Sequence, residues 1–214
     1  MINKKGFTLL ELVIVIGILA VLGAVSVLVL NPAQLFAQAR DTTRIEDMSV
    51  LRNALALMVS TINAPEMDGS GALACATMCF VQESAPGSVA IAENCGGRHA
   101  VARLITEDND RTVDGTGWIP ANMTLVPGGP ALSVLPIDPT NSATYFYSYV
   151  CDNSEKTYEL NAKMESSRYR CGGSDDKERT DGGNKPVTAA TACNATQPSQ
   201  DEVYELGTDA GLNL

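Results

Sequence analysis

The chain is short of basic side chains and of histidine. It has 15 lysines and arginines against 25 aspartates and glutamates, a formal net charge of −10, and a single histidine, His99. An acidic surface repels phosphate backbones, which argues against nonspecific binding of nucleic acid. No nucleophile motif of the Gly-x-Ser-x-Gly kind surrounds His99, and no glycine pair has the context of a phosphate loop. These absences leave little support for an enzyme, although carboxylate catalysis by a membrane-anchored extracellular hydrolase stays an alternative.

Charge is also nearly absent from residues 7–30, where Glu11 is the only ionisable side chain. This run is longer than the roughly 20 apolar residues that a helix needs to cross a hydrocarbon core about 30 Å thick. Lys4 and Lys5 precede it, so the positive-inside rule predicts a cytoplasmic N-terminus with the rest of the chain across the membrane. A secretory signal peptide cleaved in the Ala20–Ala24 region is the alternative, but its apolar region would be shorter.

Two features of the apolar run need an explanation. A carboxylate at membrane depth costs about 2.5–3.5 kcal/mol. Glu11 therefore either lies near the interface and reaches the headgroups or faces a cation on another chain. Gly17, Ala20 and Ala24 share one face at helical spacing. Small residues of this kind let membrane helices pack closely, but they are also common in any membrane helix.

The segment from Lys4 to Glu11 resembles the class III signal of type IV pilins and type II secretion pseudopilins. The shared features are a basic leader, Gly6 followed by Phe7, a glutamate four residues after Phe7, and the apolar helix behind them. The resemblance implies cleavage after Gly6 by a prepilin peptidase and N-methylation of Phe7. It also implies that Glu11 pairs with the Phe7 amine of a neighbouring subunit, which is physically sound because a free α-amine is mostly charged at neutral pH.

This resemblance implies a structural subunit of a homo-oligomeric or mixed pilin filament, built by an inner-membrane assembly platform. The expected location is the cytoplasmic membrane, as a single-pass protein, and then a filament at the cell surface or in the periplasm. Four segments are expected: a leader peptide at 1–6, a transmembrane and assembly helix at 7–30, an amphipathic helix at 31–64 and an extracytoplasmic, β-rich globular domain at 65–214.

Proline interrupts the helical pattern, because Pro32 removes a backbone hydrogen bond and predicts a kink or break. Beyond it, apolar residues recur at intervals of three and four, which predicts an amphipathic helix that ends at Ala64-Pro65. The charged positions between them are expected to be solvated or to meet neighbouring subunits. The apolar stripe is Ile45, Met48, Leu51, Leu55, Met58 and Ile62, and the charged positions are Arg40, Asp41, Arg44, Glu46, Asp47 and Arg52.

Alternating side chains predict strands in the remainder of the chain. The segments 145–150 and 156–165 form a hairpin around a turn at 152–155, and 203–206 is a candidate third strand. Three strands packed on the helix would be stable where a lone hairpin would not. The predicted class is α+β with a pilin-like fold: a long N-terminal helix, half membrane and half amphipathic, packed on a small antiparallel sheet with disulfide-rich loops. Segments 135–139 and 158–162 resemble the sheet of the major pseudopilins, whereas 66–134 carries no such resemblance.

The cysteines all follow the apolar run, and their number is even, which in an oxidising compartment predicts up to three disulfides. Among the pairings, Cys171–Cys193 is expected first, because it would close the loop rich in glycine and aspartate near the C-terminus. Zinc bound by two Cys/His pairs, Cys75-x3-Cys79 and Cys95-x3-His99, is the alternative. The six cysteines are Cys75, Cys79, Cys95, Cys151, Cys171 and Cys193.

Calcium is the one ion that the acidic residues suggest. Asp175, Asp176, Glu178 and Asp181 cluster in a glycine-rich loop, and hard cations need several oxygen ligands. Some major pseudopilins bind calcium in their C-terminal loop, but their ligand pattern does not align here. A solvated acidic loop is therefore the alternative interpretation, and no resident cofactor is expected.

Overall fold

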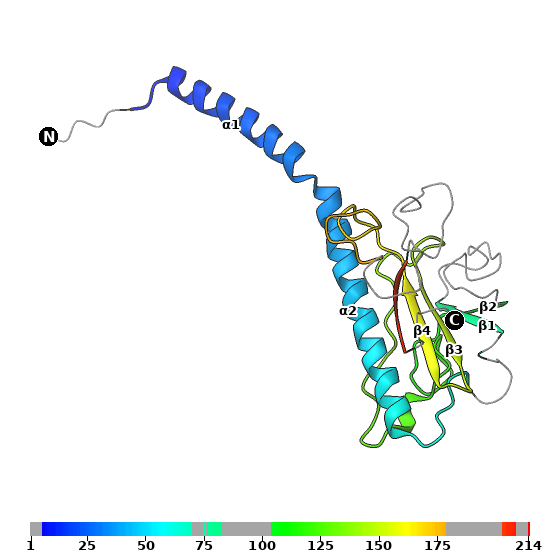
Figure 1. Ribbon diagram of the computed structural model, residues 1–214. Coiled ribbons are helices and arrows are strands. Elements are labelled where there is room, and N and C mark those ends of the chain that lie inside the picture. Colours follow the sequence, from blue (N-terminus) through cyan, green and yellow to red (C-terminus); the bar gives the residue numbers. More distant parts are fainter. Residues whose placement is uncertain (1–5, 70–74, 76, 83–103, 179–202, 209–213) are drawn as a thin grey trace.

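Two consecutive helices and a small sheet make up the protein. The computed structural model describes residues 6–69, 75, 77–82, 104–178, 203–208 and 214. Figure 1 shows the first helix extending away from the globular part, while the second lies along the sheet. The chain is α+β, as the sequence predicts, and its architecture is consistent with a pilin-like fold.

Helix α1 spans Leu9–Leu30 and makes up the extended part of the molecule. Its side chains are exposed from Leu9 to Ser26, and the helix is long and apolar enough to cross a membrane. Apolar surface of this extent is unfavourable in water, so α1 needs lipid or other protein around it.

The helical rod is interrupted at Asn31, which has a left-handed backbone with φ 40°. Pro32 is the first residue of helix α2, Pro32–Thr61, where its missing N–H costs little. The amides of Gln34 and Leu35 donate to the carbonyl of Asn31, at 3.0 and 3.4 Å. The break predicted at Pro32 therefore consists of one left-handed residue between two separate helices.

Helix α2 is held by one buried face. Met48, Leu51, Leu55 and Met58 of the predicted stripe are completely or almost completely buried, and Ile45 and Ile62 are half-buried. The helix ends at Thr61, and Pro65 follows as expected.

Five strands form the sheet, in the order β2-β1-β3-β4-β5. The predicted hairpin is present, and β3 and β4 pair antiparallel with Tyr149 opposite Leu160. The predicted third strand is β5, antiparallel to β4. Strand β1 pairs antiparallel with β3 and parallel with β2, and both β1 and β2 come from the region for which the sequence offered no strand. The strands are β1 Met78–Gln82, β2 Leu104–Asp108, β3 Tyr147–Asp152, β4 Thr157–Ala162 and β5 Tyr204–Gly207.

Tyrosines attach α2 to the sheet. Tyr147 and Tyr149 lie in the main core, whereas Phe146 and Val150 belong to a second cluster, which confirms the alternation predicted for this strand. The hydroxyl of Tyr147 donates to Oδ2 of Asp47 at 2.7 Å. The hydroxyl of Tyr158 donates to the carbonyl of Arg52 at 2.8 Å. These bonds satisfy the polar ends of buried rings and fix the rotation of α2 about its own axis.

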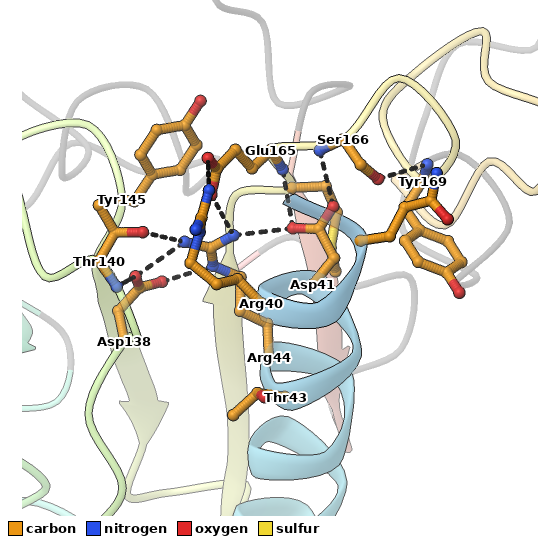
Figure 2. Close-up of polar contacts among 12 residues, drawn as sticks. Arg40, Asp41, Thr43, Arg44, Asp138, Thr140, Tyr145, Glu165, Ser166 and Tyr169 are labelled. Carbon is orange, nitrogen blue, oxygen red and sulfur yellow. Dashed lines mark hydrogen bonds and ion pairs between the residues drawn. The ribbon is translucent and has the colours of Figure 1, made fainter. Parts of the chain in front are cut away.

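A buried ion cluster fastens the first half of α2 to two loops (Figure 2). Arg44 donates through Nε and Nη2 to the two carboxylate oxygens of Asp138, at 2.7 and 2.9 Å, and through Nη1 to Asp41 at 2.8 Å. All three side chains are fully buried. Asp41 in turn accepts the backbone amides of Glu165 and Ser166, at 2.8 and 2.7 Å. One arginine thus joins α2, the segment before β3 and the segment after β4.

This cluster corrects the expectation that the charged positions of α2 are solvated, which is wrong for Asp41 and Arg44. Their burial is tolerated because every charge in the cluster has a partner of opposite sign or a backbone amide. Burial alone would lower the pKa of Arg44, but the hydrogen bonds and charges of Asp138 and Asp41 raise it above its ordinary value. Arg40 pairs with Glu165 at the rim, where the arginine side chain is 36% exposed.

A disulfide joins Cys75 to Cys151 and so links the segment after α2 to β3. Cys79 and Cys171 are also disulfide-bonded. The partners of Cys79 and Cys171 lie outside the described residues. Cys193 lies there too, so the expected Cys171–Cys193 bond stays a prediction. The zinc alternative is wrong, because Cys75 and Cys79 are not free thiolates; the other two members of that set, Cys95 and His99, lie outside the described residues.

Candidate processing and assembly segment

The residues just before α1 are accessible. Gly6 and Phe7 lie outside any helix, both are exposed, and the side chain of Phe7 is 88% exposed. An exposed segment without backbone hydrogen bonds to a sheet or helix is the kind of chain that a peptidase can bind. The Gly6–Phe7 peptide bond is therefore accessible to solvent just ahead of the apolar helix.

Glu11 makes a capping box with Thr8 at the start of α1. The carboxylate oxygen Oε2 of Glu11 accepts from the backbone amide and from the hydroxyl of Thr8, both at 2.9 Å. The amide of Glu11 donates to the Thr8 hydroxyl oxygen at 3.2 Å. These bonds satisfy amides that a helix start leaves unpaired, and the helix dipole also favours a negative charge in the first turn.

The capping box adds a third role to the two considered for Glu11 from the sequence. Within one chain the carboxylate is already occupied by Thr8, whether or not it also reaches headgroups or a second chain. The signal was present in the sequence, because Thr-x-x-Glu ahead of an apolar run is the signature of this cap. Any test of Glu11 must therefore separate its charge from its part in the cap.

The small residues of α1 pack against no other part of the chain that the structure describes. Gly17, Ala20 and Ala24 are all exposed. A Cβ added at Gly17 or at Gly23 would meet no described atom within 4 Å apart from the neighbouring backbone of its own helix. If these residues serve close helix packing, the partner is a helix of another chain.

The described carboxylates of the loop proposed for calcium contact other groups of the same loop. Asp175 pairs with Lys177 at 2.9 Å and with Arg168 at 3.5 Å. Asp176 accepts the amide of Gly172 at 2.7 Å. Asp181 lies outside the described residues, and within the described part of the chain no three His, Cys, Asp or Glu side chains gather as metal ligands.

Glu178, in the same loop, is buried and holds two backbone amides. It accepts from Met164 at 2.9 Å and from Cys171 at 2.8 Å. Burial raises the pKa of Glu178 to about 7, even though these two hydrogen bonds favour the charged form. This carboxyl group therefore stabilises the backbone of the loop through two hydrogen bonds.

Comparison with known protein families finds a match to the N-terminal segment. Residues 1–27 match the family model described as the prokaryotic N-terminal methylation motif. This match confirms the predicted class III signal and supports the type IV pilin and pseudopilin family. Together with the apolar helix α1, it indicates a membrane-anchored precursor. No curated protein and no solved structure matches the chain.

Proposed function

We propose that this chain is the precursor of a structural subunit of a helical filament, either a type IV pilus or a type II secretion pseudopilus. A prepilin peptidase cuts after Gly6 and the new amine of Phe7 is methylated. The observation that carries the proposal is the methylation motif at residues 1–27, which leads directly into an apolar helix whose described side chains are buried by nothing in the chain itself. A helix of this kind is suited first to a bilayer and then to the core of a polymer.

Assembly joins the head of one subunit to the first helical turn of the next. Glu11 of one chain pairs with the α-amine of Phe7 on its neighbour, and Gly17, Ala20 and Ala24 let the helices approach. Such a contact is heterologous, so it generates an open helical filament when its rotation does not close. An inner-membrane platform adds the subunits, and the filament contains this chain alone or together with related pilins.

Before assembly the chain spans the cytoplasmic membrane once. Lys4 and Lys5 keep the N-terminus on the cytoplasmic side, where the peptidase reaches it, and the domain beyond Asn31 lies outside. The Cys75–Cys151 disulfide supports an oxidising compartment for that domain.

Mass spectrometry of the N-terminal peptide, on protein from its native cells, tests the processing step. We expect a chain that starts at N-methylated Phe7. A chain that starts at Met1 would contradict the proposal and leave a membrane-anchored ectodomain, and a start beyond Ala24 would make the protein an ordinary secreted one.

Three variants separate the charge of Glu11 from the helix cap. Glu11→Gln keeps a side chain that completes the capping box but removes the charge, whereas Thr8→Ala removes the cap and keeps the charge. If the pairing with the amine drives assembly, Glu11→Gln and Glu11→Ala both enter the membrane but are absent from filaments, while Thr8→Ala is incorporated. Normal incorporation of Glu11→Gln would refute the charge pairing, and loss with Thr8→Ala alone would assign Glu11 to the cap. Immunoblots of sheared filaments and of membranes measure the two pools.

A further inference from the structure

The loop of residues 163–178, named here the 163–178 loop, lies beside the first turns of α2, where α1 gives way to α2 (Figure 1). Direct contacts hold it there. The side-chain carbonyl oxygen of Gln34 accepts both the amide and the hydroxyl of Ser167, each at 2.9 Å. Asp41 accepts the amides of Glu165 and Ser166 (Figure 2). The loop is therefore fixed to the part of α2 that is nearest the apolar helix.

Helix geometry gives the height of this loop relative to a bilayer. Gln34 lies four residues beyond Leu30, the last residue of α1. At about 1.5 Å per residue this is a rise of roughly 6 Å. The headgroup layer on each side of the hydrocarbon core is about 5–7 Å thick. When α1 spans a membrane, the loop contact at Gln34 lies at headgroup height.

The most exposed charged side chain of the loop's ion pairs is that of Arg168, whereas Asp175 and Lys177 are 39% and 35% exposed and pair with each other. Each carboxylate of the loop has a partner within the fold: Glu165 binds Arg40, Glu178 accepts two backbone amides, and Asp176 accepts the amide of Gly172 at 2.7 Å. Asp175 is shared between Lys177 and Arg168, and its contact with Arg168 is long, at 3.5 Å. Arg168 has a side chain that is 49% exposed. Arg170 is exposed too, and within the described residues no ion pair is formed by it.

Backbone hydrogen bonds hold the segment that carries these arginines, and a ring contact orders the guanidinium of Arg168. The amide of Arg170 donates to the carbonyl of Ser166 at 3.1 Å, and the amide of Asp175 donates to the carbonyl of Arg168 at 3.0 Å. The guanidinium of Arg168 lies over the ring of Tyr169, 5.2 Å from its centre. Gly173 allows the tight path, because a Cβ there would lie 2.2 Å from the carbonyl oxygen of Arg168. An ordered guanidinium loses less freedom when it binds an oxyanion.

From this placement we propose that Arg168 and Arg170 bind the phosphates of anionic phospholipids while α1 is in the membrane. Guanidinium groups bind phosphate oxygens in bidentate fashion, and each basic residue near an anionic surface favours the bound state by roughly fivefold. The contact sets the tilt of the globular domain on the bilayer before the chain is extracted into a filament. It rests on the membrane stage of the proposed function and not on the filament.

A fluorescence experiment on the full chain tests this contact. The chain carries Tyr169→Trp and is placed in nanodiscs of phosphatidylcholine alone, or of phosphatidylcholine with three-tenths phosphatidylglycerol, each with a nitroxide-labelled headgroup lipid. Emission from position 169 is obtained by subtracting the signal of the parent chain, whose Trp118 is buried. We expect at least twofold more quenching in the anionic discs, and loss of this excess in 0.5 M salt.

Two sets of replacements complete the test. Arg168→Gln with Arg170→Gln should remove the excess quenching. Arg52→Gln is the matched control and should leave the excess intact. Arg52 is an exposed arginine on α2, the helix that carries Gln34, and at about 1.5 Å per residue it lies about 27 Å further from the membrane than Gln34. Equal quenching in the two disc types, or equal loss with Arg52→Gln, would overturn the lipid contact alone. Failure of the chain to enter discs at all would overturn the membrane stage as well.

Discussion

Replacing Arg44 by methionine tests the buried ion cluster, and the structure sets the size of the effect. The methionine fills much of the same volume but leaves Asp41 and Asp138 buried without the cation that both now contact. Removing one partner of a buried ion pair costs about 3–5 kcal/mol, chiefly because the remaining charge is uncompensated. In a chain of this size each kcal/mol lowers the melting temperature by about 2–4 °C. We therefore expect a decrease of roughly 6–20 °C.

The neighbouring arginine is the matched control for this effect. Arg40→Met removes the same charge from the same helix, but Arg40 is 36% exposed and its partner Glu165 is 20% exposed. Solvent screens such a pair, so a loss of about 0–1 kcal/mol is expected. The two variants differ in burial and not in chemistry.

A double mutant identifies the cause of the loss. Asp138→Asn keeps a side-chain oxygen that can accept the hydrogen bond from the Thr140 amide, which is 2.8 Å long in the parent chain. It removes one of the two charges that Arg44→Met leaves uncompensated. Adding it to Arg44→Met should recover part of the stability, and the cycle of single and double mutants gives the coupling energy. Thermal and denaturant unfolding of the full chain in detergent, followed by circular dichroism, measures the four proteins of the cycle and Arg40→Met. A loss with Arg44→Met within about 1 kcal/mol of that with Arg40→Met, or no recovery in the double mutant, would refute the reasoning.

Two further predictions concern the disulfide and the loop. Cys75→Ser removes a disulfide between residues 76 apart in sequence, and in the chain-entropy account this lowers the free energy of unfolding by about 4.5 kcal/mol. Denaturant titration of the oxidised variant measures the loss, and an unchanged midpoint would contradict it. Burial raises the pKa of Glu178 to about 7 from 4.5, so between these pH values the folded chain keeps a proton that the unfolded chain loses. Stability should therefore fall by an amount on the order of 3 kcal/mol as the pH rises through this window. Glu178→Gln should abolish that share of the pH dependence, and equal pH profiles of the two proteins would refute the assignment.

The parts of the fold that the sequence predicts are those determined by neighbouring residues. The stripe from Met48 to Met58, the tyrosine hairpin and the N-terminal motif are all local patterns, and each appears in the structure. The capping box at Thr8 is local too, although the sequence prediction assigned Glu11 to a headgroup or to a second chain and not to the helix cap.

The parts that could not be predicted depend on distant contacts. Asp41 and Arg44 look like an ordinary surface pair at helical spacing, and nothing near them reveals that Asp138, 94 residues away from Arg44, completes the cluster. Strand β1 is a short apolar run, and its parallel pairing with β2 depends on a partner beyond residue 100. The Cys75–Cys151 bond likewise follows from the approach of β3, which cysteine spacing does not encode.

The single left-handed residue between the helices has a mechanical consequence. No side-chain cap from Asn31 reaches α2, so a force pulling along α1 crosses this point through the covalent backbone and the hydrogen bonds to its carbonyl. Within the next four turns the force passes sideways through Asp41 and Arg44 into the segments on either side of the hairpin. Under tension we therefore expect the angle between α1 and the domain to change first at Asn31, because the domain beyond it is held by buried ion pairs.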